Sequence, residues 1–423
     1  MIDPLIFIYN VAQVLLILLL WPLLALMVAV RPGRQRHILK RLGWSVPPGS
    51  RHAPGRKTIW VHALSVGEVT SALPLVAGIK EGLDVELVFS ATTRSGFRLA
   101  EEVIAPHADR IIFYPIDILP VIRYFLRIIH PDLFILVETD FWPNQLSALK
   151  RKKIPALLVN GRISGKSMNA YMRFGFFFRQ LFNSFSALSM QTAEDGRKLI
   201  DLGVAESKVI CLGNLKFDSR SSSKTISPAG EKRHAGIRIL AGSTHRGEEE
   251  MLLMAYRELK KDRHDLTLII APRDVSRNAE IENLAKSLGI EAFCRSQGEP
   301  AFLPDLLILD TIGDLAACYR SCDIAFTGGS LVDEGGHNPL EPAIAGIPVL
   351  FGPHMEDFAE IAEEMIAAGG AIRVDTVDGL LRSLERLIDD TPLRKTAGQA
   401  ASAYVLGKQG VVNKHLELIG KYL

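Results

Sequence analysis

Short apolar runs rich in β-branched and aromatic residues recur along the chain, and longer amphipathic stretches separate them. In the first half these runs read TIWVHA, VELVFSA, RIIFY, DLFILVE, PALLVN, ALSMQ and VICLG, and in the second half IRILAG, LTLIIA, IEAFC, LLILD, DIAFTGG and IPVLF. We expect each run to be a strand and the stretches between them, such as 94–105, 142–153 and 193–202, to be helices. Apolar strands separated by helices predict parallel sheets with right-handed crossovers, which is an α/β fold.

The two series are divided by residues 218–234, DSRSSSKTISPAGEKRH, which show no apolar periodicity and resemble a linker. A chain of 423 residues also exceeds the usual size of a single core. We therefore expect two doubly wound Rossmann-like domains, 32–217 and 235–423, behind an N-terminal segment, 1–31. In such sheets, ligands bind at the carboxyl ends of the strands.

The N-terminal segment is apolar without interruption from Val14 to Val30, and only Asn10 and Gln13 interrupt it further back to Leu5. This length approaches the roughly 20 residues that span a bilayer, so the segment is expected to be a membrane anchor. A cleaved signal peptide is the alternative, but no basic residue precedes the run and no A-x-A-like site ends it. A shallow re-entrant helix is a second alternative because Pro22 interrupts the run.

The distribution of charge predicts how the anchor is oriented in the membrane. The chain is 48% hydrophobic, 23% charged and carries a net charge of +2, yet no Asp or Glu occurs from Pro4 to Gly67, where basic residues cluster after Arg31. Such a collar suits an anionic partner, and the adjacent apolar run favours a membrane surface over nucleic acid. The positive-inside rule then predicts that everything after residue 31 lies in the cytoplasm.

Three polar groups of the first half follow predicted strands. Glu68 comes after IWVHA at a helix start, where a carboxylate can accept a proton from a sugar hydroxyl or merely interact with the helix dipole. Glu138 ends DLFILVE, either as a ligand group or as a cap of the next helix, and Arg162 after PALLVN could bind an anion. Lys216 lies between apolar neighbours before the linker, as a phosphate ligand or a solvated linker residue.

In the second half the candidate chemistry suits phosphate. The small residues 241–244 follow a strand and precede a helix, so their N–H groups could face an anion. Arg273 follows Pro272 at another strand end, where a guanidinium can bind a phosphate. The run 328–342 is glycine-rich and leads into a helix, with Asn338 as the expected N-cap, Pro339 in the first turn, and Glu341 as an acceptor for ribose hydroxyls or as a buried partner of an arginine. The four cysteines form no CxxC pair, so no metal is expected.

Seven motifs together resemble, in order, those of bacterial 3-deoxy-D-manno-octulosonic acid (Kdo) transferases of lipid A assembly. They are HALSVGE (62–68), ETDFWPN (138–144), NGRIS (160–164), GNLKFD (213–218), AGSTHRGEEE (241–250), GGSLVDEGGHNPLEPA (328–343) and FGPHMEDF (351–358). The resemblance runs over the whole chain. It departs from the usual pattern at ETDFWPN, where many members end in Glu-Leu-Trp-Pro-Asn, and at IGDL (312–315), where Gly-Glu-Leu is usual.

The resemblance implies a GT-B glycosyltransferase that is inverting and metal-independent, needs no cofactor and uses CMP-Kdo as donor. It implies Glu68 as general base and Glu138 and Lys216 as groups that stabilise the transition state. The residues implied to hold CMP are Pro272, Arg273, Gly313, Asp314, Leu315, Asn338, Pro339, Leu340 and Glu341. The implied acceptor is the glucosamine disaccharide of a lipid A precursor, lipid IVA, at the cytoplasmic side of the inner membrane, in lipopolysaccharide core biosynthesis.

Two other interpretations remain open. The chain could be a different GT-B protein, such as a UDP-sugar transferase or a UDP-sugar 2-epimerase, which a preference for uracil would reveal. It could also be a catalytically silent nucleotide-binding scaffold at the membrane, although the presence of both Glu68 and Glu138 argues against this interpretation.

Overall fold

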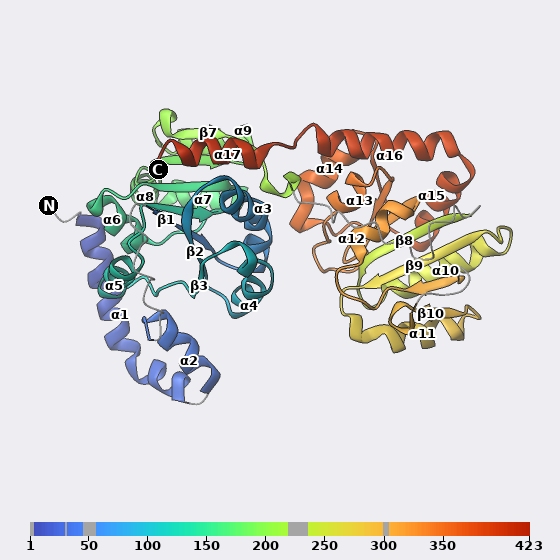
Figure 1. Cartoon of the computed structure of the whole chain (residues 1–423), viewed down its shortest axis with the longest axis horizontal. Coiled ribbons are helices and arrows are strands. Elements are labelled where there is room, and N and C mark those ends of the chain that lie inside the picture. The colour runs from blue at the N-terminus through green and yellow to red at the C-terminus, as the bar shows by residue number, and fades with distance from the viewer. Residues whose placement is uncertain (1–3, 30–31, 45–55, 219–235, 299–303) are drawn as a thin grey trace. The chain divides into compact units, whose positions relative to one another are not determined.

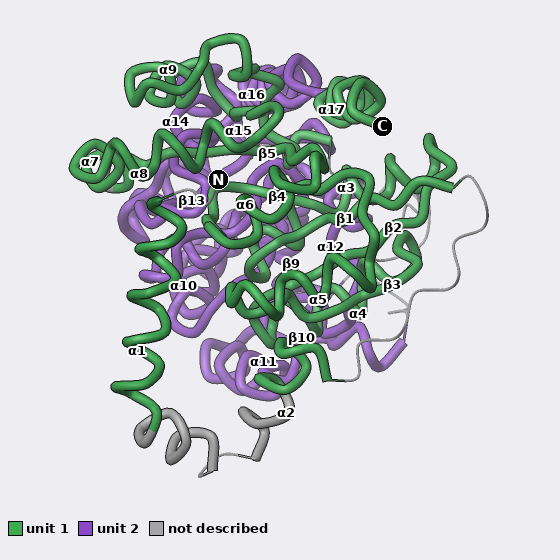
Figure 2. The backbone as a smooth tube through the Cα atoms, turned by 90° about the vertical axis from the view of Figure 1, so that its left-hand side faces the viewer, with its two compact units in different colours: residues 1–219, 410–423 green, residues 220–409 purple. Residues whose placement is uncertain are grey.

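A computed structural model describes residues 4–29, 32–44, 56–218, 236–298 and 304–423. The chain folds into two compact units: unit 1 contains residues 1–219 and 410–423, and unit 2 contains residues 220–409 (Figure 2). Each unit is built around a seven-stranded parallel sheet (Figure 1). Most of the predicted linker, from residue 219 to residue 234, lies outside the described residues.

The sheet of unit 1 has the strand order β3-β2-β1-β4-β5-β6-β7. Its strands are β1 (Lys57–Ala63), β2 (Val85–Ala91), β3 (Arg110–Phe113), β4 (Leu133–Val137), β5 (Ala156–Gly161), β6 (Ala187–Met190) and β7 (Val209–Cys211). The helices between them are α3 (Val66–Gly82), α4 (Arg94–Val103), α5 (Leu119–Ile129), α6 (Pro143–Lys152), α7 (Gly165–Arg173), α8 (Gly175–Phe182) and α9 (Ala193–Asp201). The order reverses between β1 and β4, which makes their carboxyl ends the topological switch point where open α/β sheets bind ligands.

Helices cover both faces of this sheet because successive residues of its strands face opposite sides. In β1, Ile59 and Val61 pack into one fully buried cluster with α3 and α4, whereas Trp60, between them, packs into a second cluster with α5 and α6. Burial of apolar side chains on both faces explains why these strands are continuously apolar and do not alternate with polar residues.

The sheet of unit 2 has the order β10-β11-β9-β8-β12-β13-β14. Its strands are β8 (Ile237–Thr244), β9 (Leu266–Pro272), β10 (Ala292–Cys294), β11 (Leu306–Ile308), β12 (Ile324–Thr327), β13 (Val349–Phe351) and β14 (Ala371–Arg373). Its helices include α10 (Glu248–Lys260), α11 (Asn278–Ser287), α12 (Leu315–Cys318), α13 (Leu340–Ile344), α14 (Ala359–Ala367), α15 (Val377–Asp389) and α16 (Thr391–Leu406). Here the switch point lies between β8 and β12, which pair in parallel.

Every apolar run predicted as a strand forms one, and the three predicted helices are confirmed as α4, α6 and α9. The prediction lacked β14, Ala371–Arg373, which pairs with β13 as the last strand of its sheet. Its segment has two apolar residues followed by an exposed arginine, so it lacks the apolar run that predicted the other three-residue strands.

The last helix belongs to unit 1, which differs from the expected C-terminal domain of 235–423. Helix α17 (Val411–Gly420) returns to unit 1, where Val411, Leu418 and Ile419 are buried in the same cluster as β1. Asp218 fixes the start of this helix by accepting hydrogen bonds from the N–H groups of Gly410, at 2.8 Å, and Val412. The physical reason is that α17 buries its apolar face on the first sheet.

The N-terminal segment forms helix α1 (Pro4–Ala29), and α2 (Pro32–Arg41) follows it. Among the described residues, α1 is the helix long and apolar enough to cross a membrane, judged by length and composition. From Val14 to Trp21 its side chains are largely exposed. Exposed apolar surface of this extent is typical of contact with lipid or with another protein.

Candidate active site

Glu68 and Glu138 follow the two adjacent strands at the switch point of unit 1. Strands β1 and β4 pair in parallel, so both end at the same edge of the sheet. Glu68 lies in the first turn of α3, where its Oε2 accepts hydrogen bonds from the Ser65 N–H, at 3.0 Å, and from the Ser65 hydroxyl. The Glu68 carboxylate is therefore fixed at the start of a helix, in the half-buried rim of the sheet.

Glu138 is held by an unusual backbone conformation. Its φ of 62° lies in the left-handed region, and its N–H donates to the carbonyl of Val159 at 2.9 Å. A non-glycine residue in this region occurs where the surroundings hold it in place, and such positions are enriched at functional sites. The Asn160 amide donates to Glu138 Oε1 at 3.3 Å, so neighbouring strands aim the carboxylate.

The Glu138 carboxylate interacts electrostatically with Glu68 and with the nearby cations Lys216 and Arg162. Burial and the Glu68 carboxylate raise the pKa of Glu138, whereas Lys216, the Ser71 hydroxyl and Arg162 lower it, and the net shift is upward. The structure thus brings Glu68, Glu138 and Lys216 together, as the sequence suggested separately for each. A carboxylate with a raised pKa, beside a second carboxylate and a lysine, can exchange a proton and stabilise developing positive charge.

Lys216 reaches this place through a short 3₁₀ helix, η3 (Leu215–Asp218). Leu215 and Phe217 on either side of it are buried, and the Leu215 N–H donates to Asn160 Oδ1 at 2.9 Å. Asn160 therefore connects η3, β5 and Glu138. Lys216 is part of the packed unit 1 and is no solvated linker residue.

Asp140 is a further acidic group of this site that the sequence interpretation did not single out. Burial raises its pKa, and the Glu68 carboxylate raises it further, although the N–H of Phe141 and the indole of Trp142 lower it. Its position two residues after Glu138, in ETDFWPN, was the available signal. The site in unit 1 therefore contains three carboxylates at one edge of the sheet.

The predicted CMP-binding residues of unit 2 end or follow strands β9, β11 and β12 at the carboxyl ends of its sheet. Arg273 follows Pro272 at the end of β9, and its N–H donates to the carbonyl of Thr244 at 3.0 Å. Burial raises the pKa of Glu341, while Asn338 and Arg273 lower it. The Asn338 side-chain amide donates to Glu341 Oε1 at 3.4 Å, and Asn338 Oδ1 accepts from the Leu340 N–H at 3.1 Å. Glu341 is thus a half-buried carboxylate that interacts electrostatically with Arg273.

The segment Gly313–Leu315 follows β11 and leads into α12. Gly313 has a φ of 95°, and the Asp314 carboxylate accepts a hydrogen bond from the Thr311 hydroxyl. One turn beyond Leu315, Tyr319 is buried, and burial followed by the charge of Glu341 raises its pKa strongly. Helix α12 therefore connects this segment to Glu341.

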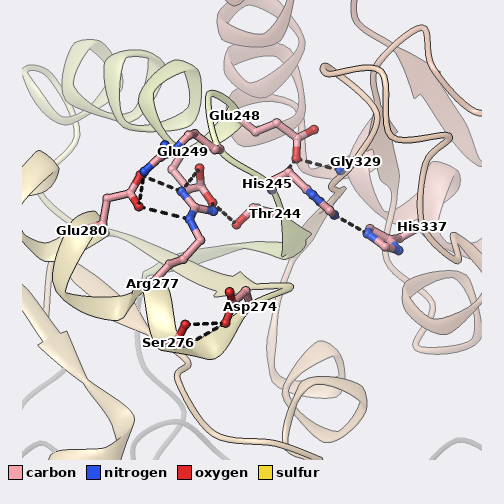
Figure 3. Close-up of polar contacts among 11 residues, drawn as sticks. Thr244, His245, Glu248, Glu249, Asp274, Ser276, Arg277, Glu280, Gly329 and His337 are labelled. Atoms are coloured by element: carbon pink, nitrogen blue, oxygen red, sulfur yellow. Dashed lines mark hydrogen bonds and ion pairs between the residues drawn. The ribbon is translucent and has the colours of Figure 1, made fainter. Parts of the chain in front are cut away.

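Glu248, which the sequence analysis did not single out, binds backbone N–H groups of the glycine-rich run. Its carboxylate accepts hydrogen bonds from the N–H groups of His245, Gly329, Ser330 and Leu331, at 2.7–2.9 Å. Figure 3 shows the bond from Gly329. The N–H groups of Gly329, Ser330 and Leu331 in the glycine-rich run therefore already have an anionic partner. A buried carboxylate already fills the place of the anion. Residues 241–244, expected to face an anion, are the last residues of strand β8 and are not among these donors.

A second network surrounds this carboxylate. Nε2 of His245 and Nε2 of His337 lie 2.8 Å apart, so one ring donates to the other (Figure 3). Burial lowers the pKa of His337 to about 4, and the charge of Arg273 contributes. The His337 ring is thus neutral near pH 7, and His337 is positioned beside Arg273.

One group of side chains in the described part of the chain has the geometry to hold a metal ion. The ligand atoms of Asp333, His354 and Glu356 lie within 4.8 Å of one another on the surface of unit 2. None of the three belongs to the predicted site residues, and exposed acidic groups of this kind are common without an ion.

Comparison with known proteins identifies the family. The family model described as 3-deoxy-D-manno-octulosonic-acid transferase (kdotransferase) matches residues 36–219, and that of glycosyl transferases group 1 matches residues 245–404. The 3-deoxy-D-manno-octulosonic acid transferase of Haemophilus influenzae is 30% identical over 401 residues, which cover 93% of this chain and 92% of that protein. The enzyme of the same name from Bordetella pertussis is 31% identical and covers 88% and 89%.

Solved structures support the fold alone. The UDP-GlcNAc 2-epimerase of Neisseria meningitidis, bound to UDP-GlcNAc, has a TM-score of 0.60 at 14% identity and covers 86% of this chain and all of that one. This likeness agrees with two Rossmann-like sheets of the GT-B class. The full-length relatives show that the chain belongs to the 3-deoxy-D-manno-octulosonic acid (Kdo) transferase family of glycosyltransferases.

Proposed function

We propose that the chain transfers Kdo from CMP-Kdo to a hydroxyl of the glucosamine disaccharide of lipid IVA, with inversion at the anomeric carbon, in lipopolysaccharide core biosynthesis. The observation that carries this proposal is the convergence of Glu68, Glu138 and Lys216 at the switch point of unit 1. A Kdo transferase needs a base for the acceptor hydroxyl and fixed charges for the sugar, and this cluster offers both.

Glu68 is proposed as the general base. The acceptor hydroxyl gives its proton to Glu68 as its oxygen forms a bond to the anomeric carbon of Kdo, and the bond between that carbon and the CMP phosphate oxygen breaks. The acceptor oxygen attacks the anomeric carbon from the face opposite to the leaving phosphate, so the configuration at that carbon inverts. The transition state has oxocarbenium character, so the Glu138 carboxylate is suited to stabilise it, with Lys216 as a counter-charge.

CMP is proposed to bind unit 2 through Pro272, Arg273, Gly313, Asp314, Leu315, Asn338, Pro339, Leu340 and Glu341. Arg273 is the cationic group of this set, and a guanidinium binds phosphate oxygens in pairs. Glu341 is half-buried, and its acceptor oxygens suit ribose hydroxyls. The donors bound by Glu248 are left out of this set, since they already have an anionic partner.

The reaction is proposed to need no metal and no cofactor. A leaving CMP phosphate carries at most two negative charges, and Lys216 and Arg273 can supply comparable positive potential. Transfer should therefore persist in a chelator such as EDTA. The surface group Asp333, His354 and Glu356 provides a control, because its removal by His354→Ala should leave turnover unchanged if no bound ion takes part.

The enzyme is proposed to work at the cytoplasmic side of the inner membrane. Helix α1 offers an apolar surface to the lipid. The basic residues after it are attracted to anionic lipids, and each Lys or Arg near the membrane surface contributes about 1 kcal/mol of binding free energy. The acceptor is a lipid with phosphates, so an enzyme held at the surface meets it where it resides. Nucleic acid is not expected as a partner.

Mass spectrometry of the products is the test. The purified full chain is incubated with tetra-acylated lipid A precursor and either CMP-Kdo or a UDP-sugar. A mass increase by Kdo, with CMP-Kdo alone, supports the proposal and also gives the number of units added. Conversion of UDP-GlcNAc without transfer would favour the 2-epimerase activity of the structural neighbours instead.

A further inference from the structure

The first turns of α1 are bound to unit 1 by polar side chains. The Tyr9 hydroxyl donates to Asp117 Oδ2 at 3.2 Å, and the Gln13 amide donates to the Asp117 carbonyl at 3.0 Å. The Asn10 amide donates to Oδ1 of Asn144 at 2.8 Å. Asn144 is fully buried, and Asp117 is 4% exposed. The two residues that interrupt the apolar run, Asn10 and Gln13, are therefore docking residues.

Helix α2 returns to the same segment of unit 1. The Arg41 guanidinium donates from Nε to the carbonyl of Tyr114 at 3.0 Å, and the carbonyl of Arg41 accepts from the N–H of Ile116 at 3.1 Å. The His37 ring lies edge-on to Phe113 at 4.7 Å. The contacts of α2 with residues 113–116 thus lie next to Asp117, the residue between β3 and α5 that α1 contacts.

These two attachments limit how far α1 can extend from unit 1. From Val14 to Ala29 the helix is about 24 Å long at a rise of about 1.5 Å per residue, which is shorter than the roughly 30 Å of a bilayer core. His37 of α2 contacts unit 1, and most of the chain between Ala29 and His37 is helical. A polypeptide of this length and conformation spans at most about 20 Å, so Ala29 lies within about 20 Å of unit 1. The far end of α1 therefore cannot lie across a bilayer from unit 1.

The exposed part of α1 nevertheless needs an apolar partner. Leu15, Leu18, Leu19 and Trp21 are each more than 60% exposed, and they lie beyond the docking residues. Exposing this surface to water is unfavourable in proportion to its area. Because polar neighbours are absent from the run and basic residues follow it, the fitting partner is a lipid bilayer with anionic headgroups.

The neighbouring surface of unit 1 fits the same partner. A cavity of about 900 Å³ is lined by Leu5 and Ile8 of α1, by Phe176 of α8, and by Lys150 and Arg151 of α6. Phe176 is 68% exposed. An apolar floor beside two basic side chains matches the chemistry of acyl chains and headgroup phosphates.

We propose that α1 and α2 form a re-entrant hairpin that enters one leaflet and leaves it on the same side, so that the N-terminus lies on the side of the catalytic units. This inference rests on the membrane association in the proposed function, and it corrects the spanning anchor expected from the apolar length. The positive-inside rule then no longer sets the orientation, because no segment crosses.

The topology is measured with epitope tags on both ends of the full chain. Protease is added to intact spheroplasts and, separately, to inverted inner-membrane vesicles. The hairpin predicts that both tags are protected in spheroplasts and both are cut in inverted vesicles. Cleavage of the N-terminal tag in intact spheroplasts, with the C-terminal tag protected, would overturn the hairpin while leaving the transferase proposal intact. Recovery of the chain in the soluble fraction would overturn the membrane association itself.

Variants test the role of the docking residues. The double variant Asn10→Leu with Gln13→Leu removes the docking hydrogen bonds and makes the run continuous, so the share of N-terminal tag cut in spheroplasts should rise roughly tenfold or more. Ala12→Leu, on the exposed side between them, adds apolar surface without removing a contact and should behave as the unaltered chain. A double variant with unaltered tag protection would contradict the inference.

Discussion

Ser189 in β6 and His415 in α17 are joined by a 2.9 Å hydrogen bond, although 226 residues separate them. Nδ1 of His415 lies 2.8 Å from the Val411 carbonyl, which can only accept. Nδ1 therefore carries the proton, and Nε2 accepts from the Ser189 hydroxyl. Both ring nitrogens are thus satisfied in the neutral form, and burial disfavours the charged form of this ring.

Acid should therefore weaken unit 1 through His415. Burial lowers the pKa of His415 to about 4, below the ordinary value of 6.5. Between these values the unfolded chain binds more protons than the folded one, so stability rises with pH and is lost as pH falls through this window. From pH 7.5 to pH 5, the His415 contribution to the free energy of unfolding should fall by about 2 kcal/mol.

Urea unfolding of His415→Gln at both pH values measures this contribution. The variant should be less stable at pH 7.5, since it loses the paired hydrogen bonds, but it should lose less on acidification than the unaltered chain. His264→Gln, at an exposed histidine of unit 2, should leave the pH dependence unchanged. An identical acid loss in His415→Gln and the unaltered chain would show that His415 is not responsible.

Glu68→Gln separates the proposed base from the structural role of the same side chain. The glutamine oxygen can still accept from the Ser65 N–H, so the start of α3 is preserved, but an amide cannot take a proton from the acceptor. We expect kcat to fall by roughly 10²–10⁴-fold, with CMP affinity near that of the unaltered chain. Steady-state transfer and calorimetric CMP binding are the measurements.

Glu101→Gln, on the exposed face of α4, is the matched control and should retain full turnover. Unaltered turnover in Glu68→Gln would remove Glu68 from the mechanism. A parallel loss of CMP affinity would instead indicate a change in the structure of the site and not the loss of a base.

Glu248→Gln should destabilise unit 2 more than any exposed change nearby. The carboxylate accepts from four backbone N–H groups, and an amide has only one oxygen for them and adds two donors of its own. Hydrogen bonds to a charged group contribute about 1.5–3 kcal/mol each, so a loss of about 3 kcal/mol or more is expected. Thermal unfolding should show it, and Glu250→Gln, two residues on and exposed, should not.

Gly328→Ala tests how closely β8 and β12 approach at the switch point of unit 2. The Gly328 N–H donates to the Gly242 carbonyl at 2.8 Å, and a Cβ on Gly328 would lie 2.4 Å from the carbonyl oxygen of Ser243. Because the obstacle is backbone, the strands must shift, and we expect a loss of about 1–3 kcal/mol. Gly165→Ala, where a Cβ meets nothing within 4 Å, should keep the melting temperature of the unaltered chain.

How far the sequence predicted the fold depends on how apolar each element is. Strands that belong to an apolar run between helices leave a clear pattern, and these predictions are confirmed. In β14, Arg373 ends the run after two apolar residues, so this strand leaves no such pattern. The assignment of α17 failed for another reason: a helix shows which of its faces is apolar but not which sheet that face will cover.

The candidate site was predictable in part. Glu138 and Arg273 directly follow apolar strands, and Glu68 lies in the first turn of the helix after one. Parallel strands end at one edge, so chain order alone placed these residues at ligand-binding edges. Lys216 stood beside an apparent linker, and only the Leu215–Asn160 contact reveals that it belongs to the packed unit. Glu248 looked like one of three glutamates at an ordinary helix start, and its burial against four N–H groups could not be inferred from spacing.

By itself, the sequence determined the two parallel sheets, the polar residues at their strand ends, the family motifs and the apolar N-terminal run, because each is encoded by residues close together in the chain. Only the tertiary structure decided that α17 completes unit 1, that Glu248 holds the glycine-rich run, and that Asn10 and Gln13 dock α1 beside the return of α2. These three depend on hydrogen bonds and burial between segments far apart in the sequence, and no local pattern specifies which distant partner satisfies a buried polar group.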